Sequence, residues 1–258
     1  LSDKGHRIVM ACRNMDKSKT ILEELKKENP LRNLELMEID LADMGSVEKF
    51  AEKFLSENKK LDVLINNAGL FSEKGQVTKD GFELAMGVNY LGCVYLTELL
   101  LPVILKTEKA RIIIVSSKAA FFGKLQKNLF TSSISGFKAY SASKLAQVLY
   151  AIYLSKRLAG CGVSVNSAHP GAVATDIWRG GTTMMKFARP VMKKFGLSPE
   201  DGAKILNFLA VSDEVESVTG KMFEMGKILK YPKSFLDENK IKNLVDETFK
   251  ALGMENVL

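Results

Sequence analysis

The feature of this sequence that most constrains its fold is a regular alternation of short apolar runs with amphipathic segments. Segments such as 15–28 and 46–57 place apolar side chains at the spacing of a helix. Between such segments, continuous apolar runs predict buried strands at 7–12, 34–39, 61–65, 111–115 and 163–168. Strands that are apolar on both faces and alternate with helices are typical of a parallel sheet covered on both sides. We therefore predict an α/β fold with a doubly wound, three-layer parallel sheet.

Polar or turn-forming residues follow each of these predicted strands within two positions. They are Arg13, Asp40, Asn66, Ser117 and Pro170. In open parallel sheets, ligands bind in the crevice beyond the carboxyl ends of the strands. We therefore expect these five residues to lie around one shared site.

A tyrosine and a lysine four residues apart begin the predicted helix after the fourth of these strands. On a helix, Tyr140 and Lys144 would share one face. A nearby ammonium group favours the phenolate and lowers the pKa of a phenol, which is ordinarily about 10. Such a pair can act as a general acid and base on a carbonyl or alcohol oxygen. A chance spacing on an ordinary helix is the structural alternative.

Composition excludes several classes of protein. No continuous apolar run reaches 18 residues, so no membrane span is expected. The cysteines and histidines are scattered without the spacing of metal ligands or of a disulfide framework, which predicts no metal site and a reducing, cytoplasmic location. The net charge of +7 is spread along the chain without a basic block, so nucleic acid is not an expected partner.

Six short motifs give the chain a resemblance to the short-chain dehydrogenase/reductase family. They are Asp40-Leu41, Asn66-Asn67-Ala68-Gly69, Asn89-Tyr90-Leu91-Gly92, Val115-Ser116-Ser117, Tyr140-Ser141-Ala142-Ser143-Lys144 and Pro170-Gly171-Ala172-Val173-Ala174-Thr175. They occur in the family's order and extend over most of the chain. The segments Ala11-Cys12-Arg13-Asn14 and Thr219-Gly220-Lys221-Met222-Phe223, and the long interval from Ser117 to Tyr140, are most similar to the retinol dehydrogenase branch.

The resemblance implies a single Rossmann-like, NAD(P)-binding domain over residues 1–258 and a catalytic set of four residues. Tyr140 would exchange a proton with the substrate oxygen, and Ser117 would hydrogen-bond that oxygen. Lys144 would lower the pKa of Tyr140 and bind the nicotinamide ribose. Asn89 would hold a water molecule that links Lys144 to solvent.

The resemblance also implies a set of cofactor contacts. Besides Tyr140 and Lys144, they are Arg13, Asp40, Asn66, Ala68, Gly69, Pro170, Gly171 and Thr175. Arg13 follows the strand where acidic relatives bind the adenosine ribose, and an arginine there suits a 2′-phosphate, so NADP(H) is expected rather than NAD(H). The structural alternatives are an exposed turn for Arg13, a helix cap for Asp40 and a strand-ending turn for 66–69.

The sequence departs from the family at its beginning. The first strand of the family and its glycine-rich phosphate loop are not present before Arg7. We expect the strands at 7–12 and 34–39 to lack a partner that would join them to the strand at 61–65. We also expect the working protein to have additional residues before Leu1. The alternative is a non-catalytic short form that acts as a binding or regulatory protein.

Two segments rich in Phe and Met are expected to form the substrate wall, because such side chains suit an apolar and adaptable pocket. The first lies within 118–138 and contains Phe121, Phe122, Leu125, Leu129, Phe130, Ile134 and Phe137. The second is a predicted substrate lid over 177–196. We predict a lipophilic carbonyl or alcohol substrate such as a retinoid, steroid or lipid aldehyde, with packing against the core as the alternative.

Two further contacts are left open by the sequence. Basic residues at 186–194 are compatible with a peripheral membrane contact, although a solvated helix face is the simpler interpretation. A homodimer would use the predicted helices near 81–106 and 139–160, where members of the family often pair.

Overall fold

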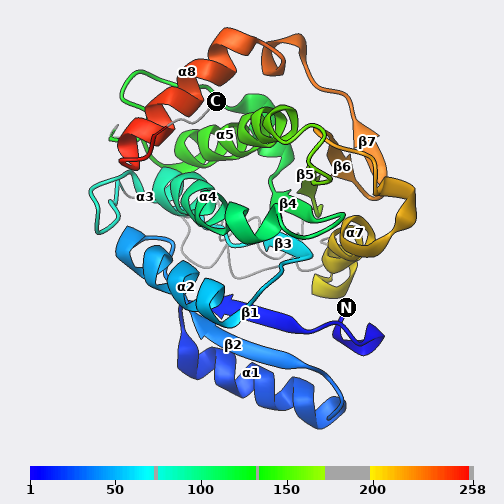
Figure 1. Cartoon of the computed structure of the whole chain (residues 1–258). Coiled ribbons are helices and arrows are strands. Elements are labelled where there is room, and N and C mark those ends of the chain that lie inside the picture. The colour runs from blue at the N-terminus through cyan, green and yellow to red at the C-terminus, as the bar shows by residue number, and fades with distance from the viewer. Residues whose placement is uncertain (73–74, 132–133, 172–197, 256–258) are drawn as a thin grey trace.

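The computed structural model describes residues 1–72, 75–131, 134–171 and 198–255, in which helices and strands alternate as predicted (Figure 1). The elements follow one another in this order: η1 (Ser2–Lys4), β1 (Ile8–Cys12), α1 (Met15–Glu28), β2 (Leu34–Glu38), α2 (Met44–Glu57), β3 (Val63–Asn66), α3 (Leu84–Met86), η2 (Gly87–Leu91), α4 (Gly92–Ile104), β4 (Arg111–Val115), η3 (Lys118–Phe122), α5 (Gly136–Arg157), β5 (Ser164–His169), α7 (Pro199–Val211), η5 (Asp213–Val215), β6 (Met222–Glu224), β7 (Lys227–Leu229), η6 (Lys233–Phe235) and α8 (Glu238–Ala251).

The described strands form two separate sheets. β1 pairs in parallel with β2, and the second sheet has the order β3-β4-β5-β6-β7. Neighbouring strands from β3 to β6 are parallel. Within the described part of the chain no strand joins β1 to β3, which confirms the expectation that the first two strands lack this partner. The α/β fold with its parallel, helix-covered sheet is confirmed.

The last strand, β7, is antiparallel and was missed by the sequence analysis. It returns beside β6 through a tight turn in which Met225 and Gly226 both have positive φ values, 47° and 78°. Two positive φ values are typical of a hairpin whose turn matches the twist of the strands. Because β7 has only three residues and two of them are exposed, it carries little of the apolar pattern that marks a buried strand.

Both faces of the larger sheet are buried, which gives the predicted three layers. On β4, Ile112 and Ile114 belong to the core cluster formed with α4 and α5. Ile113 points the other way and packs with Ile205 and Leu209 of α7. Alternate residues of this strand therefore enter two different cores, because successive side chains of a strand point to opposite faces. This arrangement explains why the run is apolar throughout.

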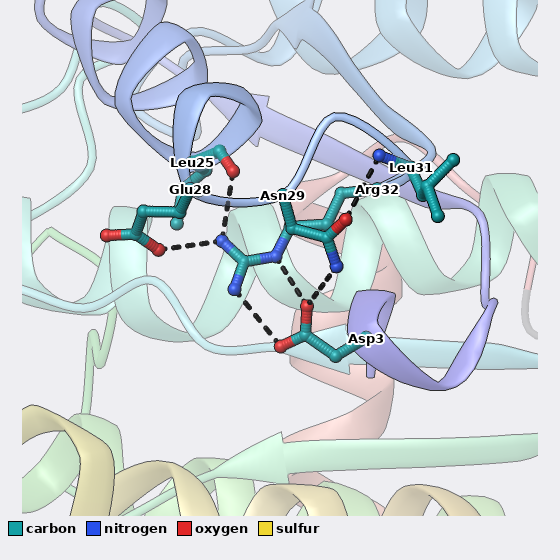
Figure 2. A network of polar contacts seen from close by, with 6 residues as sticks. All are labelled: Asp3, Leu25, Glu28, Asn29, Leu31 and Arg32. Carbon is teal, nitrogen blue, oxygen red and sulfur yellow. Dashed lines mark hydrogen bonds and ion pairs between the residues drawn. The ribbon is translucent and has the colours of Figure 1, made fainter.

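The smaller sheet is fastened at its beginning by a polar network. Figure 2 shows the Arg32 guanidinium between two carboxylates, 2.6 Å from Asp3 and 2.9 Å from Glu28. The same guanidinium donates to the Leu25 carbonyl oxygen, 3.0 Å away, near the end of α1. Hydrogen bonding to Arg32 also holds the pKa of Asp3 below its usual value. The network ties the turn before β1 to the end of α1 and the loop before β2.

The helix-length segment Leu84–Ile104, made of α3, η2 and α4, lies in the core. Among the described segments, it alone is long and apolar enough to be a candidate membrane span, with a mean hydropathy of 1.5 over its most apolar 18 residues. Of this stretch, 89% is buried inside the protein. Polar residues such as Asn89 and Glu98 interrupt it, so the sequence shows no continuous apolar run of that length. Such burial is characteristic of the central helix of a globular domain.

The helix α8 covers part of α5. The Thr248 hydroxyl of α8 lies 2.8 Å from the Tyr90 hydroxyl of η2, and the Phe249 ring lies 6.0 Å from the Arg157 guanidinium at the end of α5. On the other side, α4 packs against α2. The two helical regions that a homodimer would use are therefore packed extensively within the chain itself.

Candidate active site

The candidate site lies where the central strands of the larger sheet end. β3 ends at Asn66, β4 at Val115 and β5 at His169, and the parallel pairing brings these ends to one edge. The expected residues Ser117 and Pro170 follow within two positions of the strand ends. This is the edge at which ligands bind in open parallel sheets.

The helix α5 supplies Tyr140 and Lys144, and both side chains are buried, at 7% and 3% exposure. The Lys144 Nζ atom lies 5.6 Å from the centre of the Tyr140 ring, so the predicted pair does share one face. The ammonium group donates to the Val115 carbonyl oxygen and to Gln147 Oε1, each 3.0 Å away. Lys144 is thus anchored both to the end of β4 and to its own helix.

Asn89 lies on η2, a turn of π-helix within the buried segment before α4. Its side chain accepts a hydrogen bond from the Leu70 amide (2.8 Å) and donates to the Leu70 carbonyl oxygen (3.0 Å). It also donates to Ser143 Oγ on α5, 2.9 Å away. These contacts bind three elements together: the loop after β3, the π turn and α5. Single π turns inside helices occur frequently at functional sites.

Of the two serines that follow β4, Ser117 is the one that remains accessible. Its hydroxyl accepts from the Ala119 amide at the start of η3, 3.2 Å away, and its side chain is close enough to Tyr140 to lower the pKa of the phenol. Ser116 is buried and donates to the Lys144 carbonyl oxygen, 2.9 Å away. The structure therefore places Ser116 in the framework and Ser117 beside the phenol, as expected from the motif.

Burial controls the electrostatics of the pair. It raises the pKa of Tyr140, and the hydrogen bond from Ser117 opposes this rise. Burial also lowers the pKa of Lys144 to about 8. Lys144 is not among the groups that shift the pKa of Tyr140 in this structure, so the expectation that it lowers this pKa stays a prediction. Desolvation dominates at both groups, while the ammonium directs two of its hydrogen bonds to Val115 and Gln147.

Gly69 leaves space directly above the lysine. A Cβ atom at this position would lie 3.3 Å from Lys144 Nζ and 3.5 Å from Asn89 Oδ1. A side chain there would crowd the ammonium group, so glycine keeps the space beside it free of side-chain atoms. Ala68, the preceding residue, is exposed at the same edge.

Two of the expected cofactor contacts lie on the smaller sheet. Arg13 is exposed after β1, and among the described residues no carboxylate lies within ion-pair distance of it. Asp40 follows β2 and accepts from the Ala42 amide, 2.9 Å away, while Asp43 rather than Asp40 caps α2. The next residue, Leu41, packs against Gly92 at the start of α4, one turn beyond Asn89. Asp40 is thereby brought near the main site.

Other expected contacts have different outcomes. The Asn66 side chain is buried and donates to Thr97 Oγ1 on α4, 2.9 Å away, so it fastens β3 to that helix and does not face the open edge. Pro170 and Gly171 lie at the end of β5, and Gly171 has a φ of 87°. Thr175 and the predicted lid at 177–196 lie outside the described residues.

Two residues of the site were missed by the sequence analysis. Phe71 follows the loop after β3, and its ring centre lies 5.6 Å from that of Tyr140. Gln147 is 1% exposed and bridges Lys144 to the Asn89 carbonyl oxygen. A signal for Gln147 was available, because it follows Lys144 by three positions on the same helix face. The sequence analysis treated Gln147 only as one residue of the predicted helix.

Comparison with known proteins agrees with this geometry. The family model for short chain dehydrogenases matches residues 1–186. Human retinol dehydrogenase 13 is 35% identical, over 99% of this chain and 80% of its own length. Human retinol dehydrogenase 14 is 34% identical, over 97% of this chain and 80% of its own.

Solved structures share the fold. A protein from Mycobacterium paratuberculosis described as uncharacterized aligns with a TM-score of 0.76 at 28% identity, over 100% of this chain and 88% of its own. A short chain dehydrogenase from Escherichia coli CFT073, complexed with NADPH, aligns with a TM-score of 0.64 at 22% identity, over 83% of this chain and 84% of its own.

The fold and the site define a nicotinamide-dependent oxidoreductase that acts on CH–OH groups. The chain belongs to the short-chain dehydrogenase family, within its retinol dehydrogenase-like branch. The residues present fit the cofactor of this family, because the space beside the Lys144 ammonium group, which a Cβ atom on residue 69 would fill, lies at the edge where the strands end.

Proposed function

We propose that this chain is an NADP(H)-dependent oxidoreductase that interconverts the carbonyl and alcohol forms of a lipophilic substrate. A retinoid is the first candidate, and a steroid or lipid aldehyde is the next. The observation that carries the proposal is the convergence of Tyr140, Ser117, Lys144 and Asn89 at the end of β4.

Each residue of this set has a distinct task. In reduction, the Tyr140 phenol donates a proton to the substrate oxygen, and in oxidation it takes one up. The Ser117 hydroxyl donates a hydrogen bond to the same oxygen and stabilises its developing negative charge. Asn89 holds the loop after β3 against α5 through Leu70 and Ser143. The nicotinamide cofactor, when bound, supplies the hydride.

The chain offers groups for the cofactor at both ends of the site. Lys144, together with the space above Gly69, would hold the nicotinamide ribose, and Pro170 and Gly171 would line the ring. Arg13, exposed and without an acidic partner among the described residues, would bind a 2′-phosphate. This feature favours NADP(H) over NAD(H), and solved proteins of the same fold include complexes with NADPH.

Aromatic side chains support a lipophilic substrate. Phe71 lies against Tyr140, and Phe137 comes one helical turn before Tyr140 on α5. The ring of Phe137, which is 52% exposed, lies 6.2 Å from that of Phe122, which is 71% exposed. By contrast, Leu129 and Phe130 of the expected substrate wall are buried in the core, as the structural alternative held. The two human relatives described above are named for retinol.

The replacement Tyr140→Phe tests the proposal, because it removes the proton-donating hydroxyl and keeps the ring. We expect the reduction of lipophilic aldehydes with NADPH to fall by about 10²- to 10⁴-fold. NADPH binding, measured by fluorescence titration, is expected to remain within a few-fold. Unchanged turnover in the variant would refute the assigned mechanism. A wild-type chain that binds NADPH but turns over no member of the aldehyde panel would favour the non-catalytic alternative.

A further inference from the structure

The second hydrogen bond of Lys144 leads to a side chain outside the established set. Gln147 Oε1 accepts from Lys144 Nζ at 3.0 Å, and Gln147 Nε2 donates to the Asn89 carbonyl oxygen at 2.6 Å. One amide group thus connects the lysine of α5 with the backbone of the π turn in η2. All three residues are at most 3% exposed, so water competes little for these bonds.

The geometry points to Gln147 as a positioning residue that fixes the direction of the Lys144 ammonium group by bridging it to the backbone of Asn89. This inference rests on the proposed function, since it assigns the residue through Lys144. The Gln147 side chain thereby connects Lys144 to the backbone of Asn89 directly.

The argument depends on the number of donors on the ammonium group. A lysine ammonium has three N–H donors in tetrahedral directions. The Val115 carbonyl oxygen and Gln147 Oε1 take two of them. With two directions fixed, the third is fixed as well, and it remains for the ligand side, where Gly69 leaves room beside Nζ. Without Gln147 the ammonium could rotate and its third donor would lose this orientation.

The charged form of Lys144 also depends on this contact. The titratable groups that face Lys144 are Cys93 from α4, His169 from β5 and Tyr140 from its own helix. Burial raises the pKa of Cys93 to about 12 and lowers that of His169, so neither is an ionised partner near neutral pH in this fold. The amide oxygen of Gln147 is therefore an important neutral acceptor for the buried ammonium.

A structural role alone would be the simpler explanation, because a buried amide that joins α5 to η2 stabilises any fold. The two explanations differ in their effect on Lys144. Gln147→Leu keeps the approximate volume and removes the acceptor, which disfavours the ammonium form and lowers the pKa of Lys144. Gln147→Glu places a carboxylate there, which favours the ammonium form and raises that pKa.

The test is the pH dependence of kcat/KM for aldehyde reduction with NADPH in wild type, Gln147→Leu and Gln147→Glu. The basic limb is expected to move to lower pH in Gln147→Leu and to higher pH in Gln147→Glu. At neutral pH, kcat of Gln147→Leu is expected to fall by about 10- to 100-fold, because a misdirected contact costs this much at a reacting centre. NADPH fluorescence titration is expected to show weaker binding by Gln147→Leu, independently of turnover.

Ser155→Ala serves as the matched control, because Ser155 is a buried polar residue of α5 whose hydroxyl donates to the Ile152 carbonyl oxygen (2.8 Å). It is expected to lower stability without moving the pH profile. Gln147 variants that match this control, with lower stability and an unshifted profile, would overturn the inference. If Gln147→Leu does not fold, an unshifted profile in Gln147→Glu overturns it equally. Failure of the proposed function is distinguishable, because either Tyr140→Phe would then retain wild-type turnover or the wild-type chain would turn over no member of the aldehyde panel.

Discussion

At the scale of single residues, burial shifts the pKa values of two ionisable groups in the candidate site. The pKa of Tyr140 is raised and that of Lys144 is lowered to about 8, both because of desolvation. Each change favours the neutral form of its group. The protonated phenol is the form that donates a proton to a carbonyl, and the phenolate is the form that accepts one from an alcohol.

The preference for NADPH over NADH is a second property that we assign to a single residue, Arg13. We expect Arg13→Glu to reduce the ratio of kcat/KM for NADPH to that for NADH by about 10- to 100-fold, because a hydrogen bond to a charged group contributes roughly 1.5–3 kcal/mol. Steady-state kinetics with both cofactors measure the ratio. Lys26→Glu, an equal charge change at an exposed position of α1, is the control. An unchanged ratio in Arg13→Glu would exclude a 2′-phosphate contact at this residue.

Several of these residues could be assigned from the sequence, and others could not, for a physical reason. Tyr140, Lys144 and Ser117 belong to short local motifs, so their neighbourhood follows from helix spacing and strand ends. The hydrogen bond from the Asn66 side chain to Thr97 could not be predicted, because Thr97 is distant in the sequence, and the cofactor contact expected of Asn66 stays a prediction. Phe71 was missed for the same reason, since its contact with Tyr140 forms only in the folded chain.

At the scale of elements, the short helix η3 sets the position of Ser117 relative to α5. η3 begins directly after Ser117 and ends before Gly123, which approaches α5 closely. A Cβ atom on Gly123 would lie 2.7 Å from the Leu145 Cβ atom and still closer to the Ser141 carbonyl oxygen. No side chain fits there without moving one element from the other.

We therefore expect Gly123→Ala to lower the free energy of unfolding by about 1–3 kcal/mol, as overpacking does, and to lower kcat as well. Urea unfolding and aldehyde reduction measure the two effects. Gly75→Ala is the control, because a Cβ atom there would meet nothing within 4 Å. Wild-type stability and turnover in Gly123→Ala would mean that η3 does not position Ser117.

Most elements could be predicted from local signals. The helix expected at 15–28 is observed as Met15–Glu28, with Asn14 as its cap, and the strand at 111–115 is observed with the same bounds. The π turn at Gly87–Leu91 was not predicted, because it differs from an α-helix by a single register shift and leaves no distinct pattern of residues. The helix α7 begins at Pro199 after the Ser198 cap, a local combination that is typical of a helix start.

At the scale of the whole molecule, α8 occupies the outer side of α5. Glu238 near its start pairs with Lys156 at 2.9 Å, and Phe249 near its end lies against Arg157. We therefore expect the protein to be a monomer in solution, in place of the homodimer that the sequence left open. Size-exclusion chromatography with light scattering measures this directly. A dimer broken by Lys156→Glu would show that α5 still pairs with a second copy.

The two-sheet arrangement has a consequence for how the molecule unfolds. A continuous ladder of backbone hydrogen bonds makes strands melt together, but among the described strands none passes from β1 to β3. The part of the chain that holds the β1-β2 sheet contacts the part that holds the larger sheet through the packing of α2 on α4. Contacts such as the ion pair of Lys79 with Asp43 add to this packing. Local opening can then differ between the two parts. A dinucleotide that reaches from Arg13 to Lys144 would bind both sheets at once. Its binding would couple their unfolding, so that two separate transitions become one.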